Sequence, residues 1–201
     1  MFPDIARDDV FRLETPSLWL RWPRASDAAA VHRYSSRWDV AQYTARIPHP
    51  YPPGSAERFI FAARAGNTAG RDLTLVIAPR AGKRDAIGAI SLEGHSGERL
   101  TLGIALAPEV WRRGYASEAT AAMLAAGFSL THCVEINADS RVENLASRRV
   151  LEKTGFAYVG TGPQGAPARG GLVSCDRYRF TREAWSARRE AEREAMVEAA
   201  R

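Results

Sequence analysis

The sequence predicts a single α/β domain in which a mixed, mostly antiparallel sheet is flanked by helices. Three observations support this prediction. The chain has 201 residues, 45% of them hydrophobic, so it can enclose one compact core. Its first strands follow one another through short turns, as in hairpins, whereas its later strands alternate with helices. The chain also shows no internal repeat, and nothing marks a second domain.

Several segments have the alternation and the β-branched composition of strands. They are Ser17–Trp22, Leu73–Ala78, Ala86–Leu92, Leu100–Leu106, Val134–Ala138, Phe156–Gly160 and Ser174–Thr181. Turns are predicted at residues 82–85 and 94–98, between the second and fourth of these segments. The Gly- and Pro-rich stretch Thr161–Gly171 predicts a loop before the last strand.

Helix patterns and caps lie between these strands. The predicted helices are Ala28–Ser36 after Asp27, Ser55 to about Arg64, about Ser117–Leu130, about Asn144–Thr154, and Arg182–Arg201. Gly155 follows the fourth helix at the position where a left-handed residue ends helices. The stretch Ile47–Gly54 contains four prolines and is predicted to be irregular.

Composition excludes several classes of protein. No segment has the roughly 18 apolar residues that a membrane span needs, and the acidic N-terminus is unlike a secretion signal. The two cysteines, Cys133 and Cys175, imply no disulfide framework, which is typical of a cytoplasmic protein. The net charge is +5, but the basic residues are dispersed, so nucleic-acid binding is a minor alternative. The four histidines lie apart without ligand spacing, which predicts no metal.

The segment from Leu106 to Glu118 carries the strongest chemical signal. A strand ends there, Pro108 turns the chain, and Gly114 precedes a helix that begins near Ser117. A glycine turn before a helix presents unpaired amides and the positive end of the helix dipole, an arrangement that binds phosphate or pyrophosphate. Arg112 and Arg113 add two guanidinium groups beside the turn. Taken alone, the same residues also fit an ordinary strand-to-helix turn with exposed arginines.

Two long motifs favour the phosphate-binding interpretation, because each resembles a motif of a known family. Trp111-Arg-Arg-Gly-Tyr-Ala-Ser-Glu-Ala119 resembles the WGKGYATEA form of the pyrophosphate loop in the RimJ/RimL-like branch of the GNAT superfamily of N-acetyltransferases. Asn144–Phe156 resembles NxxSxxVLEKxGF of the same branch. More weakly, Glu14–Arg21 is similar to an opening ETxRLxLR strand, with Ser17 in place of the usual Arg, and Thr181–Trp185 to a closing TREEW.

The resemblance implies the GNAT acyl-CoA N-acyltransferase fold, with a core over about residues 13–186 and a helical tail over 187–201 of one domain spanning 1–201. It implies acetyl-CoA as the cosubstrate and an amine as the acceptor. Backbone groups of Ile104 and Leu106, on either side of Ala105, would contact the pantetheine arm and the thioester. Asn144 would bind the pantetheine, and Arg148 could reach the nucleotide phosphates, unless it is only a solvent-facing helix residue. The amides expected to hold the pyrophosphate are those of Arg112, Arg113, Gly114, Tyr115, Ala116 and Ser117.

Amine acetylation needs a polarised thioester carbonyl, a proton for the departing thiolate and a path for the amine proton. The amide near Leu106 is the expected oxyanion donor. Many GNAT enzymes carry a Tyr acid seven residues after the motif Asn, but that position here is Leu151. Ser147, one helical turn after Asn144, is therefore the candidate acid, although it could merely cap or pack.

For the base, the superfamily often has a carboxylate on the preceding strand, where Asp139 stands. Asp139 could equally be a turn residue, with Glu93 as a rival base, and Glu118 is expected to be a first-turn helix residue. Positioning alone could also supply most of the acceleration.

Some functional questions stay open in the sequence. A GNAT fold that binds acyl-CoA as a sensor, without turnover, is an alternative to an enzyme. The loops Arg46–Gly54 and Thr161–Gly171 are expected to border the acceptor, but neither selects between a protein N-terminus and a small amine. The Ala/Glu/Arg tail could pack on a second subunit, which leaves a homodimer open.

Overall fold

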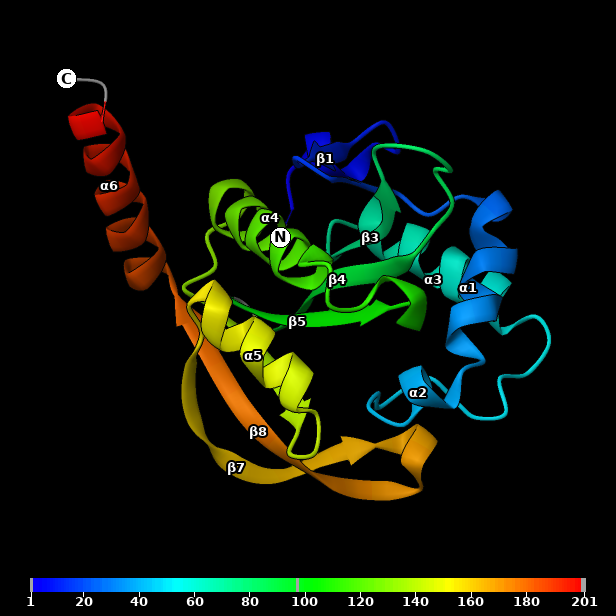
Figure 1. Cartoon of the computed structure of the whole chain (residues 1–201). Coiled ribbons are helices and arrows are strands. Elements are labelled where there is room, and N and C mark those ends of the chain that lie inside the picture. Colours follow the sequence, from blue (N-terminus) through cyan, green and yellow to red (C-terminus); the bar gives the residue numbers. More distant parts are fainter. Residues whose placement is uncertain (1, 97, 200–201) are drawn as a thin grey trace.

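The computed structural model describes residues 2–96 and 98–199 (Figure 1). Residue 97 of a predicted turn and residues 200–201 of the predicted last helix therefore lie outside the described residues, as does residue 1. The strands are β1 (Arg12–Glu14), β2 (Leu18–Arg21), β3 (Asp72–Pro79), β4 (Gly88–Ser96), β5 (Arg99–Leu106), β6 (Glu135–Arg141), β7 (Ala157–Ala166) and β8 (Gly171–Thr181). The helices are α1 (Ala28–Ser35), α2 (Trp38–Ala41), α3 (Ser55–Thr68), α4 (Tyr115–Leu130), α5 (Leu145–Thr154) and α6 (Arg182–Ala199).

All the strands join one eight-stranded sheet in the order β1-β2-β3-β4-β5-β6-β8-β7. Only the β5–β6 pair is parallel among the described strands, and the other neighbours are antiparallel. The helix α4 makes the long crossover that a parallel pair requires. The mixed, mostly antiparallel sheet predicted from the sequence is thus confirmed.

Helices cover both faces of the sheet, and side-chain alternation assigns each strand residue to one face. On the first face, here called the α4/α5 face, Leu92, Leu102 and Ile136 pack in the main core together with Met123 of α4. On the opposite face, the α1/α3 face, Ala105 packs against a smaller cluster from α1, α2 and α3. Figure 1 shows α4 beside α5 and α1 beside α3 at the other side of the sheet.

The sheet opens where β5 and β6 diverge. Their parallel pairing covers only three positions, from Arg99 opposite Glu135 to Thr101 opposite Asn137. Beyond this point β6 continues along β8 as far as Arg141. The second half of β5 therefore has a strand neighbour on one side only, and its other backbone edge lines a gap between β5 and β6. No helix in the described part of the chain is long and apolar enough to cross a bilayer.

The prediction for Thr161–Gly171 was wrong. β7 continues to Ala166 and forms a long hairpin with β8, closed by a 3-10 turn at Pro167–Arg169. The glycines in this stretch have a low strand propensity, but pairing with β8 along its full length overrides it. The short elements β1 and α2 were also missed, because three or four residues carry too little periodicity to detect.

Candidate functional site

The predicted phosphate loop is an exposed turn with unpaired amides. Gly114 has φ +81°, and α4 begins at the next residue, Tyr115. The first bond of the helix runs from the Glu118 N–H to the Gly114 carbonyl, 3.0 Å away. Within the described residues, the amides of residues 112–117 find no acceptor, which is the usual state of a first helical turn. Unpaired amides of this kind, together with the positive end of a helix dipole, favour an anion nearby.

The backbone of this loop is adapted to a ligand at its surface. A Cβ added to Gly114 would meet nothing within 4 Å inside the protein. Arg112 is the one described non-glycine residue with positive φ, at 62°, a conformation that costs L-residues on the order of 1 kcal/mol. Both Arg112 and Arg113 are exposed. The glycine therefore leaves open space where a phosphate could approach.

The free edge of β5 lies next to this loop in sequence. The N–H of Ala107, just beyond β5, donates to the carbonyl oxygen of Ile87 at 2.8 Å, so these residues form a hydrogen-bonded pair. Because such pairs alternate along antiparallel strands, Ala105 directs its backbone groups toward β4, and Ile104 and Leu106 direct theirs into the gap. The carbonyl oxygen of Leu106 accepts a hydrogen bond from Trp111 Nε1 at 2.9 Å. The N–H of Leu106 and both backbone groups of Ile104 thus face the gap without a partner in the described chain.

The helix α5 brings two predicted residues to its N-terminus. Asn144 is the N-cap, and its Oδ1 accepts a hydrogen bond from the Ser147 N–H at 3.1 Å. Both residues are partly buried, and the described residues provide no partner for the Ser147 hydroxyl. Leu151, at the position of the missing Tyr, is 3% exposed and belongs to the core. Because α5 packs against α4, whose N-terminus holds the loop, Asn144 and Ser147 lie on the same layer as the phosphate loop.

Arg148 has partners inside the fold. Its Nε donates to the Tyr178 hydroxyl at 3.3 Å and lies 3.3 Å from Asp176 Oδ2, an ion pair without hydrogen-bond geometry. Asp176 is nearly buried, and its other carboxylate oxygen accepts a hydrogen bond from Thr161. The guanidinium of Arg148 is thus directed toward β8, and its predicted contact with nucleotide phosphates stays a prediction.

Asp139 lies inside β6, opposite Arg177 of β8, rather than in a turn. Its neighbour Ala138 belongs to the core on the α4/α5 face, so Asp139 points to the α1/α3 face. Although its side chain is exposed, desolvation by surrounding groups raises its pKa, and the charge of Arg177 opposes this rise only in part. A carboxyl with a raised pKa accepts a proton more readily than an ordinary aspartate does.

The rival carboxylate, Glu93, points to the same face, because Leu92 beside it lies in the core of the opposite face. Glu93 Oε1 accepts a hydrogen bond from the Ser91 hydroxyl at 3.1 Å and a short one from Arg46. Arg46 was predicted only as part of a bordering loop. No local signal in the sequence could have indicated this pair, whose members are 47 residues apart.

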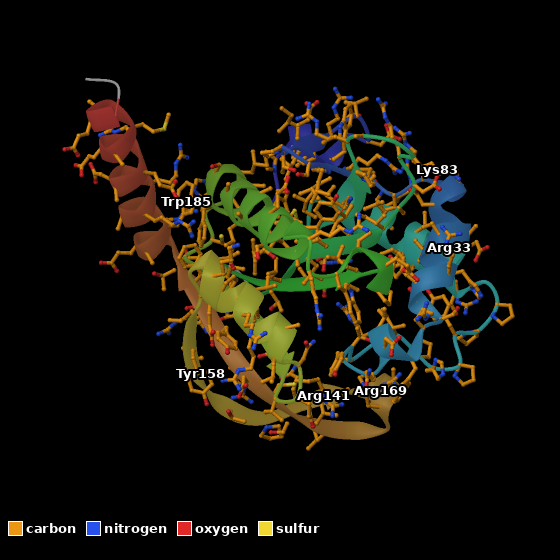
Figure 2. The ribbon with its side chains drawn as sticks, viewed as in Figure 1. Arg33, Lys83, Arg141, Tyr158, Arg169 and Trp185 are labelled. Carbon is orange, nitrogen blue, oxygen red and sulfur yellow. The ribbon has the colours of Figure 1, made fainter. Side chains whose placement is uncertain are left out.

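Two segments meet across the α1/α3 face. The Ala168 N–H in the tip of the β7–β8 hairpin donates to the Ala45 carbonyl at 3.0 Å, and Arg169 donates to the Ile47 carbonyl at 2.6 Å. Arg141 at the end of β6 reaches the Gln42 carbonyl at 3.4 Å. Figure 2 shows Arg141 and Arg169 near each other beside α2 and the hairpin. The two loops predicted to border an acceptor are therefore joined.

The remaining reactive groups show no catalytic arrangement. Cys133 and Cys175 are free thiols inside the protein, and burial raises the pKa of Cys175. Glu118 lies in the first turn of α4, as predicted, and its Oε1 accepts hydrogen bonds from Thr15 and Ser17. Among the residues whose side chains the structure describes, no cluster of three or more His, Cys, Asp or Glu residues could hold a metal ion.

Solved structures of acetyltransferases share this fold. A GNAT-family acetyltransferase from Bacillus anthracis is 25% identical, with a TM-score of 0.74, and the match covers 86% of this chain and 99% of that one. Mycobacterium smegmatis RimJ, solved with CoA-disulfide, is 23% identical with a TM-score of 0.73 and coverage of 83% and 82%. Spermidine N-acetyltransferase from Vibrio cholerae, solved with CoA and spermine, is 17% identical with a TM-score of 0.71 and coverage of 85% and 99%.

Among curated proteins, no sequence matches this one. The family model described as acetyltransferase (GNAT) domain, in contrast, matches residues 17–157. This match includes the whole segment from the free edge of β5 to the end of α5. The chain therefore belongs to the GNAT acetyltransferase family.

Proposed function

We propose that this protein transfers the acetyl group of acetyl-CoA directly to a primary amine. One observation carries the proposal: an unpaired strand edge at Ile104–Leu106 leads, within a few residues, into a turn of unpaired amides at the α4 N-terminus. The first feature suits an extended amide-containing arm, which can pair with a strand edge. The second suits a pyrophosphate. Coenzyme A joins an arm and a pyrophosphate of these kinds.

The residues present fit this cosubstrate. The open space at Gly114 permits close approach of a phosphate, and Arg112 and Arg113 supply positive charge beside it. The amides of residues 112–117 would hold the pyrophosphate, and the edge of Ile104 and Leu106 the pantetheine arm. The amide nitrogen of Asn144 would add a hydrogen bond to that arm, because its oxygen is already used as the helix cap.

Bound acetyl-CoA supplies a thioester whose carbonyl carbon accepts the amine nitrogen while the carbon–sulfur bond breaks. The Leu106 N–H, which faces the gap, would stabilise the negative charge that develops on the carbonyl oxygen. The Ser147 hydroxyl would give a proton to the departing sulfur. The proton that the amine loses would go to Asp139, or to Glu93 beside Arg46. Both carboxylates point to the α1/α3 face, the side from which the acceptor amine would approach.

The acceptor would approach from the α1/α3 face, between the segment after α2 and the β7–β8 hairpin. The carboxylates on this face suit an amine, but each has an arginine as neighbour. Both a protein N-terminus and a small amine therefore remain within the proposal, and the polyamine complex of the Vibrio cholerae relative makes spermidine a useful first probe. The residues from about 13 to 186 would carry the activity in a single domain, and a homodimer through α6 is part of the proposal only as an arrangement to test.

The test is a panel of acceptors with acetyl-CoA as donor. Spermidine, and peptides that begin with Ala or Ser, would be compared by release of free thiol and by mass increase of the acceptor. We expect acetylation of at least one class and a thermal shift on adding acetyl-CoA. A shift without thiol release from any amine would favour the acyl-CoA sensor, and the lack of any shift would contradict the proposal.

A further inference from the structure

Two side chains outside the loop anchor the predicted phosphate loop at its ends. Before the loop, Trp111 donates from Nε1 to the carbonyl oxygen of Leu106 at 2.9 Å. The indole thus ties the start of the loop to the last residue of β5. The same hydrogen bond occupies the carbonyl oxygen of Leu106, so that of its two backbone groups only the N–H faces the gap without a partner in the described chain.

After the loop, the carboxylate of Glu118 reaches the N-terminal hairpin. Its Oε1 accepts hydrogen bonds from the Thr15 hydroxyl at 2.6 Å and from the Ser17 N–H at 2.7 Å. Thr15 is only 8% exposed, and its hydroxyl is also hydrogen-bonded within the β1–β2 turn to Leu18. Hydrogen bonds to a carboxylate are stronger than neutral ones, so this contact is a firm attachment.

Between these two anchors the first part of the loop has little support of its own, whereas Tyr115 and Ala116 pack against the main core. Residues 111–114 are exposed, and Arg112 and Gly114 both have positive φ. A non-glycine residue holds such a conformation only where its surroundings impose it. The hydrogen bonds of Trp111 and Glu118 lie directly before and after residues 112–117 and are placed to impose it.

We propose that Trp111 and Glu118 are positioning residues that hold this loop in its anion-binding form, with the β1–β2 turn as the fixed support for Glu118. The proposal rests on the proposed function of the loop in binding acetyl-CoA. It assigns Glu118 a role as a hydrogen-bond acceptor, which requires no proton transfer. It also gives the turn Thr15–Ser17, distant in sequence, a supporting role at the proposed cofactor site.

The two anchors should affect different kinetic parameters. Glu118 holds the α4 end, where the pyrophosphate would bind, so its loss should weaken binding of acetyl-CoA. Trp111 holds Leu106, whose N–H would face the carbonyl of the bound thioester. Loss of the Trp111 hydrogen bond should therefore lower kcat. A general loss of stability would not change mainly the Kd of acetyl-CoA in one variant and mainly kcat in the other.

For Glu118 we expect Glu118→Ala to raise the Kd of acetyl-CoA at least about tenfold, with kcat at saturation within about twofold of wild type. Glu118→Gln keeps an acceptor oxygen and should restore most of the affinity. Thr15→Val removes one donor and should add little to Glu118→Ala, because residues of one contact are not additive. Equal losses in Glu118→Gln and Glu118→Ala would overturn the acceptor role.

For Trp111 we expect Trp111→Phe, which keeps the ring and removes the donor, to lower kcat about tenfold with a smaller change in Kd. Hydrogen–deuterium exchange of the segment 111–118 without any cofactor gives a second readout, and both Glu118→Ala and Trp111→Phe should speed it. Unchanged exchange in both variants would overturn the anchoring. If wild type shows no thermal shift with acetyl-CoA while hydrogen–deuterium exchange is still faster in the two variants, the proposed function fails and the anchoring stands.

Discussion

The phosphate loop and the α1/α3 face of the site are built in opposite ways. The loop is a run of consecutive residues, 112–117, with unpaired amides and with positive φ angles at Arg112 and Gly114. The α1/α3 face gathers side chains from separate elements, with Asp139 from β6 and Glu93 from β4, the latter bound to Arg46 after α2. One half depends on backbone shape and the other on side-chain chemistry.

This difference predicts how the two halves respond to mutation. Truncating side chains within residues 112–117 should have little effect, because only a change of backbone or an added Cβ interferes there. The anchors Trp111 and Glu118, which lie outside the loop, are the exceptions. On the α1/α3 face and at Ser147, removing a single functional atom should affect turnover. A motif search therefore detects the loop readily, whereas the chemistry of the acceptor side depends on contacts that only the fold brings together.

The largest effect is expected at Ser147, which belongs to the loop's side of the sheet but acts through its side chain. Ser147→Ala should lower kcat about 10²-fold or more if the hydroxyl protonates the thiolate. Affinity for acetyl-CoA should change little, since one hydroxyl contributes about 1 kcal/mol to binding. Steady-state kinetics with a confirmed acceptor checks this. A wild-type kcat with weakened binding would make Ser147 a cofactor contact.

Asp139 tests the α1/α3 face, and Asp139→Asn should lower kcat/KM on the order of 10²-fold at neutral pH if Asp139 is the base. Activity should fall on acidification as the carboxylate is protonated, and the raised pKa places that fall above the ordinary aspartate range. Arg177→Gln should move it to still higher pH, because the charge of Arg177 lowers the pKa of Asp139. A pH profile unchanged in Asp139→Asn would transfer the role to Glu93 or to water.

The same group predicts a dependence of stability on pH. Folding raises the pKa of Asp139, so the native state binds its proton more tightly than the unfolded state does. The charged carboxylate therefore destabilises the fold above its native pKa, and this penalty disappears as the pH falls through that pKa. Thermal melts should show Asp139→Asn more stable than wild type near neutral pH, with the difference shrinking toward pH values below the ordinary aspartate pKa.

Gly114 tests the backbone half. Gly114→Val should raise the Kd of acetyl-CoA at least about tenfold, because the branched side chain occupies the space where the pyrophosphate would lie. Gly82→Val is a matched control, since Gly82 has φ +74°, and a Cβ there also meets nothing within 4 Å. Thermal shifts with and without acetyl-CoA compare them. An equal ligand-induced shift in a folded Gly114→Val would remove the phosphate-loop assignment.

The arginines should have smaller effects than the backbone. Affinity for CoA should decrease with salt and be lower for dephospho-CoA, as for any exposed contact with phosphates. Arg148→Gln should change that affinity by less than about threefold, because Asp176 and Tyr178 already engage the guanidinium. If Arg148→Gln abolishes the difference between CoA and dephospho-CoA, Arg148 contacts the 3′-phosphate after all.

The smallest effect is expected from the tail, which touches neither half of the site. Trp185 near the start of α6 stacks on Phe128 with ring centroids 5.4 Å apart, whereas Glu190–Glu198 is exposed throughout. Deleting residues 190–201 should leave Kd and kcat within about twofold of wild type. Light scattering of both forms would also test whether the tail joins two subunits. A full chain that is a dimer and a truncated chain that is a monomer would show that it does.

The sequence by itself determined the fold class, the glycine turn before α4 and the family. Each depends on short-range features: alternating apolar residues make strands, and a glycine turn before a helix leaves amides unpaired whatever surrounds it. The Asn144 cap and the end of α5 at Gly155 are similarly local, and the structure contains both.

Only the tertiary structure decided the rest. Strand pairing turned the predicted loop Thr161–Gly171 into a hairpin, because hydrogen bonds along β8 outweigh the weak propensities of its glycines. Packing also paired Arg148 with Asp176, Glu93 with Arg46, and Glu118 with Thr15, which lie 28 to 103 positions apart along the chain. A charged side chain has many possible partners in the sequence, and the one that it contacts depends on which segments the sheet brings within a few ångströms.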